Sequence, residues 1–238
     1  MTTATTQDRP LLIAETFGPT FQGEGPSCGQ QALFLRLSRC NLACPGCDTP
    51  YTWDTSRFNL RDHTHRRSAG SVISWALARP TPLIVISGGE PLLQQDRLLP
   101  VVAALTTAGR RVEIETNGTV IPSPELVDQV AAFNVSPKLA AFAAESDAAR
   151  RINPAALSTL VTSGKSVFKF VVGSGADLDE VGDLVARFGL APVWVMPEGT
   201  ASEVIVARMR DLADAVLARG WNLTTRLHVL LWEDTRGR

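Results

Sequence analysis

The chain has 238 residues, 45% hydrophobic and 20% charged, which is typical of one ordinary soluble domain with a core of its own. Its formal net charge of −1 excludes the strongly basic surface that neutralises nucleic-acid phosphates, so we expect no direct nucleic-acid partner. Apolar runs stay well short of the about 20 residues that span a bilayer, and residues 1–10 are polar, so we expect a cytoplasmic protein without a membrane partner.

Short β-branched or apolar runs alternate with segments of helical period, which predicts a parallel α/β sheet or barrel. The predicted strands lie at residues 11–15, 32–38, 83–87, 111–116, 133–136, 167–172, 193–196 and 226–231. The predicted helices lie at 71–79, 95–108, 124–132, 177–188 and 202–219, with N-terminal signals in Ser123-Pro124 and Ser202. Residues 53–70 are polar and have no clear period, so we expect an insertion or lid within a single domain covering 1–238.

Unusual short motifs follow four of the predicted strands. They lie at residues 87–91 (SGGEP), 115–118 (ETNG), 136–138 (SPK) and 196–197 (MP). The loops at the carboxyl ends of parallel strands converge on one mouth of the fold. The four motifs therefore predict one shared site.

Three of the four cysteines, Cys40, Cys44 and Cys47, lie within eight positions and have the spacing C-x3-C-x2-C. Pairing two of them would leave an odd thiol, so the motif indicates metal binding rather than a disulfide scaffold. Soft thiolates bind zinc, Cu(I) or iron–sulfur clusters. Three thiolates on a cubane leave one iron without a protein sulfur, and such an open position is typical of a catalytic site.

A structural zinc site is the alternative, and it requires a fourth ligand. Cys28, twelve residues upstream in a loop rich in Gly and Pro, is the first candidate, and His63 and His65 are the others. The competing interpretation is that Cys28 is an ordinary thiol and that the His-Thr-His-Arg-Arg loop is a solvated surface.

The ordered motifs resemble the radical S-adenosylmethionine (SAM) superfamily, through the cysteine spacing and the Gly-Gly-Glu at 88–90. More narrowly, they resemble the 7-carboxy-7-deazaguanine synthase (QueE) family. The segments that carry this resemblance are 15–25 (ETFGPTFQGEG), 34–37 (FLRL), 47–49 (CDT) with Trp53, 86–91 (ISGGEP), 113–118 (EIETNG) and 135–138 (VSPK). The resemblance implies a partial, modified TIM-like barrel of mostly parallel strands with an outer layer of helices.

The resemblance also implies the site residues. It implies a [4Fe–4S] cluster on Cys40, Cys44 and Cys47, and Mg2+ on Thr49. The SAM contacts that it implies are Gly46, Cys47, Asp48, Gly88, Gly89, Glu90, Gly118, Ser136, Pro137 and Lys138. The substrate contacts that it implies are Phe21, Gln22, Gly23, Arg36, Thr116 and His228. No side chain is expected to act as an acid or base, because the cofactor supplies the radical.

Two positions depart from the family pattern. Gly46 stands where radical SAM proteins often have an aromatic residue, and the chain continues for residues 229–238 after His228, where family members often end. Two cations also need a partner, since Arg36 and Lys169 lie in apolar strands. For Arg36 that partner is either a structural carboxylate or the substrate carboxylate, and Lys169 presents the same ambiguity.

The implied activity is that of a carbon–nitrogen lyase. It converts 6-carboxy-5,6,7,8-tetrahydropterin to 7-carboxy-7-deazaguanine with loss of ammonia, in the biosynthesis of queuosine or other 7-deazapurines. The resemblance further implies an electron donor such as flavodoxin or ferredoxin, and a homodimer. Two rivals remain: a glycyl-radical activating enzyme, and a zinc or iron–sulfur module with no chemistry of its own, which normally uses four ligands.

Overall fold

The computed structural model describes residues 9–233 and 235–238. In these residues nine strands form one sheet, in the order β3-β1-β2-β4-β5-β6-β7-β8-β9. β1 is antiparallel to both of its neighbours, and each pair from β2 to β9 is parallel. The strands are β1 (Leu11–Phe21), β2 (Gln31–Leu37), β3 (His65–Arg67), β4 (Leu83–Gly88), β5 (Arg111–Thr116), β6 (Ala132–Val135), β7 (Ser166–Val172), β8 (Val193–Pro197) and β9 (Asn222–Leu223). The expectation of a mostly parallel, incomplete barrel is confirmed.

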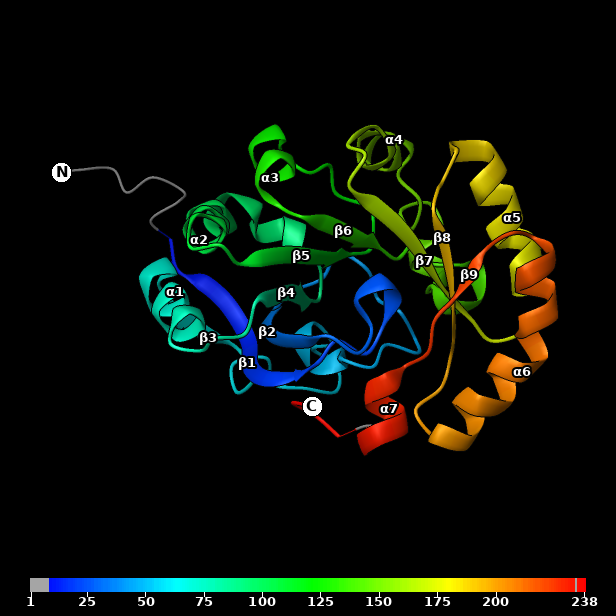
Figure 1. Cartoon of the computed structure of the whole chain (residues 1–238), viewed down its shortest axis with the longest axis horizontal. Helices are drawn as coiled ribbons and strands as arrows, with labels where there is room; N and C mark the ends of the chain where they lie inside the picture. The colour runs from blue at the N-terminus through cyan, green and yellow to red at the C-terminus, as the bar shows by residue number, and fades with distance from the viewer. Residues whose placement is uncertain (1–8, 234) are drawn as a thin grey trace.

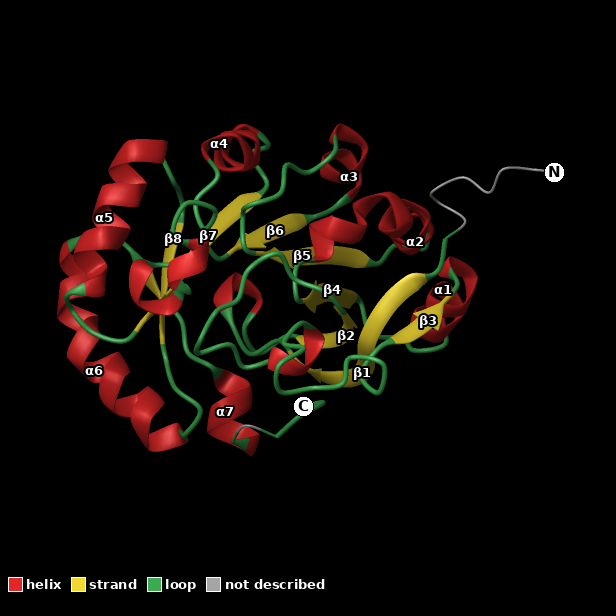
Figure 2. Cartoon of the chain, turned by 180° about the vertical axis from the view of Figure 1, so that it is seen from behind, coloured by secondary structure: helices red, strands yellow, loops and turns green. Residues whose placement is uncertain are grey.

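Helices cover the outside of the curved sheet. They are α1 (Ala69–Leu77), α2 (Gln95–Thr107), α3 (Pro124–Gln129), α4 (Pro154–Thr162), α5 (Asp177–Phe188), α6 (Ser202–Ala218) and α7 (Leu227–Trp232). The first six follow one another around the arc, whereas α7 lies at its open side, between β1 and α6 (Figure 1). The view from behind shows the same outer row of helices (Figure 2).

The strands alternate between two environments. On β5, Val112 and Ile114 are fully buried in the core against the helices, and on β7 the same is true of Phe168 and Phe170. Side chains of successive strand residues point to opposite faces, so Glu113, Glu115 and Lys169 face the inside of the arc. The core side of each strand therefore stabilises the fold, and the other side supplies polar groups to the interior.

The prediction of a strand at 226–231 is wrong, because this segment forms α7. The run is too short for its period to distinguish strand from helix. The helix is fixed instead by tertiary contacts: the amide of Leu227 donates to the carbonyl of Gly23 (2.8 Å), and Val229 is fully buried.

Of the two predicted N-terminal helix signals, the structure confirms the one at Ser123. The hydroxyl of Ser123 accepts from the amide of Leu126 and caps α3 as predicted, but Ser202 is not the cap of α6, since the cap position is Ala201. Helix α4 was not predicted, although Asn153 caps it through the amides of Ala155 and Ala156. An Asn-Pro start of this kind is a recognisable signal in the sequence.

Residues 53–70, predicted as an insertion or lid, contain regular structure at their C-terminal end. Their end forms strand β3, which pairs with β1, and Ser68 caps α1. Leu60 is buried within the segment. A lid role for the remaining residues stays a prediction.

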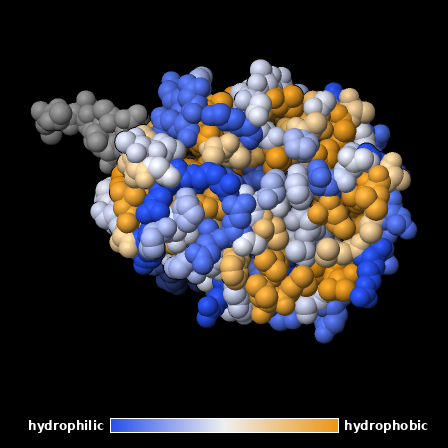
Figure 3. All heavy atoms as spheres, viewed as in Figure 1, coloured by the Kyte–Doolittle hydropathy of each residue, from blue (hydrophilic) through white to orange (hydrophobic). Residues whose placement is uncertain are grey.

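No helix in the part of the chain that the structure describes is long and apolar enough to cross a membrane. On the face drawn in Figure 3, hydrophobic side chains occur in patches separated by polar ones.

Candidate active site

A cavity of about 700 Å³ lies inside the arc, lined by residues from most strands and from the loops that follow them. All but two of the predicted site residues line it. Those that do are Phe21, Gln22, Gly23, Arg36, Cys40, Cys44, Gly46, Cys47, Asp48, Thr49, Gly88, Gly89, Thr116, Ser136, Pro137, Lys138 and His228. Glu90 and Gly118 do not line it. The predicted convergence of the strand-end motifs on one site is therefore present in the fold.

The cysteine loop presents three free thiols to the cavity. The indole Nε1 of Trp53 donates to Sγ of Cys47 (3.4 Å), and Nδ2 of Asn117 donates to Sγ of Cys40 (3.9 Å). Burial raises the pKa of the Cys40 thiol to about 12, so binding a metal there must release a proton.

The three thiols of the cysteine loop suit an iron–sulfur cluster. Across residues 9–233 and 235–238, no three His, Cys, Asp or Glu side chains meet where one metal ion could be held. Cys28 is outside the cavity lining, and its thiol donates to the carbonyl of Gly23. Three soft sulfurs with N–H donors around them suit a cluster.

The glycine pair at the end of β4 contacts the backbone just before the cysteine loop. A side chain at Gly88 would meet the carbonyl of Leu37 at 2.2 Å, and one at Gly89 would meet the carbonyl of Arg39 at 2.0 Å. The amides of Gly89 and Glu90 donate to these same two carbonyls, at 3.1 and 2.8 Å. Only glycine permits this approach, so the pair positions the backbone that leads directly into Cys40.

The two predicted SAM contacts outside the cavity lining have structural partners. Glu90 is completely buried, and its carboxylate accepts from the amides of Leu92 (2.9 Å) and Asn117 (2.7 Å) and from the hydroxyl of Thr116 (2.8 Å). Burial raises the pKa of Glu90, while these hydrogen bonds act in the opposite direction. A side chain at Gly118 would collide with Val135 at 2.8 Å. The structure thus places both residues behind the cavity wall.

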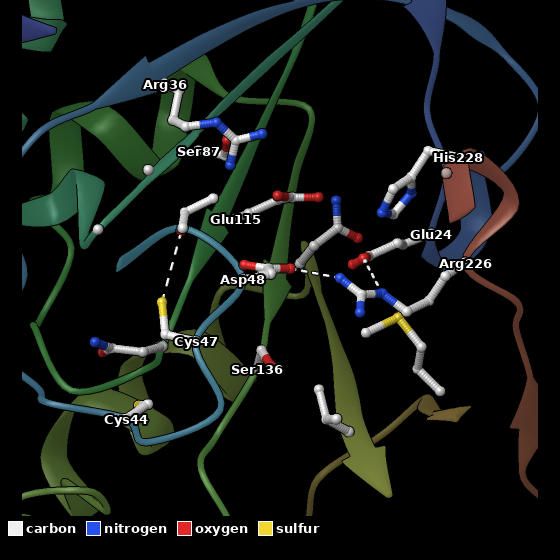
Figure 4. A pocket seen from close by; sticks show the side chains of 18 of the residues that line it. Glu24, Arg36, Cys44, Cys47, Asp48, Ser87, Glu115, Ser136, Arg226 and His228 are labelled. Atoms are coloured by element: carbon white, nitrogen blue, oxygen red, sulfur yellow. Dashed lines mark hydrogen bonds and ion pairs between the residues drawn. The ribbon is translucent and has the colours of Figure 1, made fainter. Parts of the chain in front are cut away.

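A buried charge network crosses the cavity. Glu24 contacts Lys169 and Arg226, and Arg226 also contacts Asp48 (Figure 4). Burial alone would raise the pKa of Glu24, but Lys169 and Arg226 hold it well below its usual range. The network joins the loop after β1, strand β7, the cysteine loop and the start of α7. It also identifies the partner of Lys169, which the sequence left open.

Arg36 meets a structural carboxylate. Its Nε lies 3.0 Å from Oε1 of Glu15, without hydrogen-bond geometry, and its guanidinium stands 5.5 Å from the ring centre of Phe17. Glu15 also accepts from Tyr51 and is paired with Arg236. Because Arg36 lines the cavity as well, its pairing with Glu15 leaves part of the guanidinium facing the interior.

Helix α7 closes the open side of the arc. A side chain at Gly23 would lie 2.0 Å from Nδ1 of His228, so the two residues are in direct contact. Burial lowers the pKa of His228, although Glu24 acts in the opposite direction. Phe21 stacks on Trp232 at 6.2 Å between ring centres.

The sequence left several of the lining residues without an assigned role. Residues 235–238 return to the cavity after α7, which the departure from the family pattern did not predict. The other lining residues that sequence reasoning left unassigned include Glu24, Tyr51, Glu115, Lys169 and Arg226. Glu24 and Glu115 lie inside recognised motifs, and that is the one signal that could have singled them out.

Three comparisons with known proteins agree with this geometry. The family model of the radical SAM superfamily matches residues 35–158. The 7-carboxy-7-deazaguanine synthase of Pyrobaculum aerophilum is 34% identical over 233 residues, covering 96% of this chain and 97% of its own length, and that of Halobacterium salinarum is 31% identical, covering 95% and 93%. The crystal structure of QueE from Escherichia coli superposes with a TM-score of 0.70 and 26% identity, covering 92% of this chain and 95% of that one.

Proposed function

The chain belongs to the 7-carboxy-7-deazaguanine synthase family within the radical SAM superfamily, and we propose that it converts 6-carboxy-5,6,7,8-tetrahydropterin to 7-carboxy-7-deazaguanine. This is a lyase reaction that releases ammonia and requires SAM and a [4Fe–4S] cluster. The observation that carries the proposal is that the three thiols share one cavity with Arg36 and Gln22.

Cys40, Cys44 and Cys47 would hold the cluster, and the N–H groups of Trp53 and Asn117 would support the sulfurs. When bound, the cluster and SAM supply a radical that abstracts a hydrogen atom from the substrate. Gly88, Gly89 and residues 136–138 line the cavity beside the cysteine loop, and we assign them to SAM. The assignment of Glu90 is indirect: its carboxylate holds the hydroxyl of Thr116 and the amide of Asn117, two residues that line the cavity.

The substrate side of the cavity is assigned to Arg36, Gln22, Thr116 and His228. A guanidinium matches the geometry of a carboxylate, so Arg36 is placed to bind the 6-carboxylate of the pterin. Phe21 lines the cavity and stacks on Trp232 of α7, and this ring pair would help keep bulk water from the reacting groups.

Mg2+ belongs to the same proposal. Thr49 is buried and lines the cavity, and its hydroxyl lies 3.7 Å from Sγ of Cys47, so it would offer one hard oxygen beside the proposed cluster. Mg2+ usually keeps several waters and takes few protein ligands, so one hydroxyl with oxygens of the substrate and water suits it. We further propose a single catalytic domain, a homodimer, a cytoplasmic location and a flavodoxin or ferredoxin as electron donor.

The test is a turnover assay after anaerobic reconstitution with iron and sulfide. The protein is incubated with 6-carboxytetrahydropterin, SAM, reductant and Mg2+, and 7-carboxy-7-deazaguanine is measured by mass spectrometry. Omission of Mg2+ should slow product formation. SAM cleavage without this product would leave only the superfamily assignment standing, and would favour a glycyl-radical activating enzyme. A protein that binds iron but never cleaves SAM would favour a module without chemistry.

A further inference from the structure

A buried carboxylate contacts the backbone of the cysteine loop from outside the cavity. Oδ2 of Asp147 accepts a hydrogen bond from the amide of Ala43 (2.5 Å), the residue directly before Cys44. The two partners are 104 residues apart in the chain. Asp147 is completely buried and does not line the cavity. Its carboxylate is therefore placed to act on the loop that carries the thiols rather than on a molecule in the cavity.

The loop that carries Asp147 is well supported. Asp147 ends a short 3-10 helix, Glu145–Asp147, between β6 and α4. Its carbonyl accepts from the amides of both Arg150 and Arg151 (2.8 Å each). Nη1 of Arg151 also donates to the carbonyl of Lys138 (2.7 Å), near the start of the same loop. Because the backbone around Asp147 is fixed in this way, its carboxylate can serve as a rigid support for Ala43.

The same loop also supports the first residue after Cys40. Nδ2 of Asn153, at the end of the loop, donates to the carbonyl of Thr119 (2.8 Å). The hydroxyl of Thr119 in turn accepts from Nδ2 of Asn41 (2.7 Å). The residue between Asn41 and Ala43 is Leu42, which is buried. Protein contacts thus hold all three residues between the first two cysteines of the motif.

Asp147 has a second partner in Arg150, and the competing interpretation is that Asp147 stabilises only its own turn through this local ion pair. The Arg150 side chain is 61% exposed. Half-exposed ion pairs contribute little, so Arg150 offsets only part of the cost of burying a carboxylate. A hydrogen bond to a charged group is stronger than one between neutral groups. The contact with Ala43 is therefore a main partner of the buried carboxylate, and it joins the two loops.

We propose that Asp147 is a positioning residue for the iron–sulfur cluster, which fixes the turn between Cys40 and Cys44 so that both thiols are oriented before the cluster binds. This rests on the proposed function, in that these thiols are the cluster ligands. Groups that orient metal ligands from outside the coordination sphere change metal affinity by roughly 10–100-fold. A buried negative charge beside Cys44 would also disfavour the reduced cluster, which carries one more electron, and so lower its reduction potential.

The test compares Asp147→Ala, Asp147→Asn and Arg150→Gln with the wild type after anaerobic reconstitution. Asparagine can keep the hydrogen bond from Ala43 through its Oδ1 but removes the charge. Arg150→Gln is the matched control, since it removes the local ion pair and leaves the Ala43 contact. Iron transfer to a chelator should be at least about tenfold faster in Asp147→Ala, and should stay within about twofold of the wild type in the other two variants.

Two further measurements separate the hydrogen bond from the charge. Hydrogen exchange in residues 41–47 of the apoprotein should increase in Asp147→Ala alone, because only this variant loses the acceptor for the Ala43 amide. The reduction potential of the cluster, titrated anaerobically and followed by electron resonance, should rise in Asp147→Asn. It should not rise in Arg150→Gln, which removes a positive charge instead.

Iron transfer at the wild-type rate in Asp147→Ala would overturn the proposal. Equally fast transfer in Arg150→Gln and Asp147→Ala would overturn it as well, in favour of the local turn. If Asp147→Ala does not fold, the potential decides, since an unchanged potential in Asp147→Asn would show that the carboxylate does not lie beside the cluster. None of these measurements uses the pterin. The expected iron transfer and potentials without formation of 7-carboxy-7-deazaguanine would overturn the proposed reaction and leave the role of Asp147 in place.

Discussion

Arg226 and Asp48 form an ion pair, with 2.5 Å between Nη2 and Oδ2, that joins the residue after the third cysteine to the start of α7. The two partners differ in burial. The Arg226 side chain is 8% exposed and also contacts Glu24 and the carbonyl of Gly199, whereas that of Asp48 is 43% exposed. The helix that closes the cavity is therefore tied to the cysteine loop through one buried cation.

This asymmetry predicts unequal effects on stability. Asp48→Asn should lower the free energy of unfolding by less than about 1 kcal/mol, because half-exposed ion pairs contribute little. Arg226→Gln should lower it by about 3 kcal/mol, because it removes a buried partner of Glu24. Urea unfolding of the anaerobic protein measures both. Equal losses in the two variants would show that the network is not organised around Arg226.

The cysteine assignment predicts a sharp contrast among four alanine variants. Changing Cys40, Cys44 or Cys47 should abolish the cluster and turnover, since each supplies one of three sulfurs. Cys28→Ala should keep both, because this thiol is outside the cavity lining and donates to the carbonyl of Gly23. Iron and sulfide analysis after reconstitution should give about four of each in the wild type. Loss of iron in Cys28→Ala alone would contradict the ligand set.

A substitution at Glu90 can distinguish a direct contact with SAM from an indirect effect on SAM binding. Its carboxylate holds two backbone amides and the hydroxyl of Thr116, so Glu90→Ala should lower the free energy of unfolding by about 3 kcal/mol as well as weaken SAM binding. A residue that only contacted SAM would leave the stability of the apoprotein unchanged. Thermal unfolding of the apoprotein and SAM titration of the holoenzyme measure the two effects. Weaker SAM binding at unchanged stability would favour a direct contact between Glu90 and SAM.

The sequence predicted those parts of the molecule that local patterns specify. The parallel strands and the cysteine loop have strong local signals, so their positions are predictable. Strands β3 and β9 are too short to show a period, and β1 continues past its predicted end through a register irregularity between Phe17 and Thr20. The charge network was not predictable, because Glu24 and Lys169 are 145 residues apart and only the closure of the arc brings them together.

The contact between Gly23 and His228 predicts a steric effect. Gly23→Ala would place a methyl group 2.0 Å from Nδ1 of His228, so the His228 ring must shift, and we expect α7, which carries it, to move away from the cavity. Turnover should fall while the iron content stays normal, because the cysteine loop is not touched. Gly70→Ala is the matched control, since a side chain there meets nothing within 4 Å. Hydrogen exchange in residues 227–232 should increase in Gly23→Ala alone, and unchanged exchange would contradict the predicted displacement.

Arg36 gives the most direct test of how the substrate carboxylate is bound. Its Nε approaches Glu15 without forming a hydrogen bond, while Glu15 also has Tyr51 and Arg236 as partners. Arg36→Gln should therefore leave the fold, the cluster and reductive SAM binding intact. It should raise KM for 6-carboxytetrahydropterin roughly 30-fold or more, because a charged hydrogen-bonded partner of the carboxylate is lost. Glu15→Gln is the control: it removes the competing carboxylate and leaves the guanidinium, so KM should stay the same or fall. If Glu15→Gln and Arg36→Gln raise KM equally, the ion pair matters only for structure, and the substrate carboxylate binds elsewhere in the cavity.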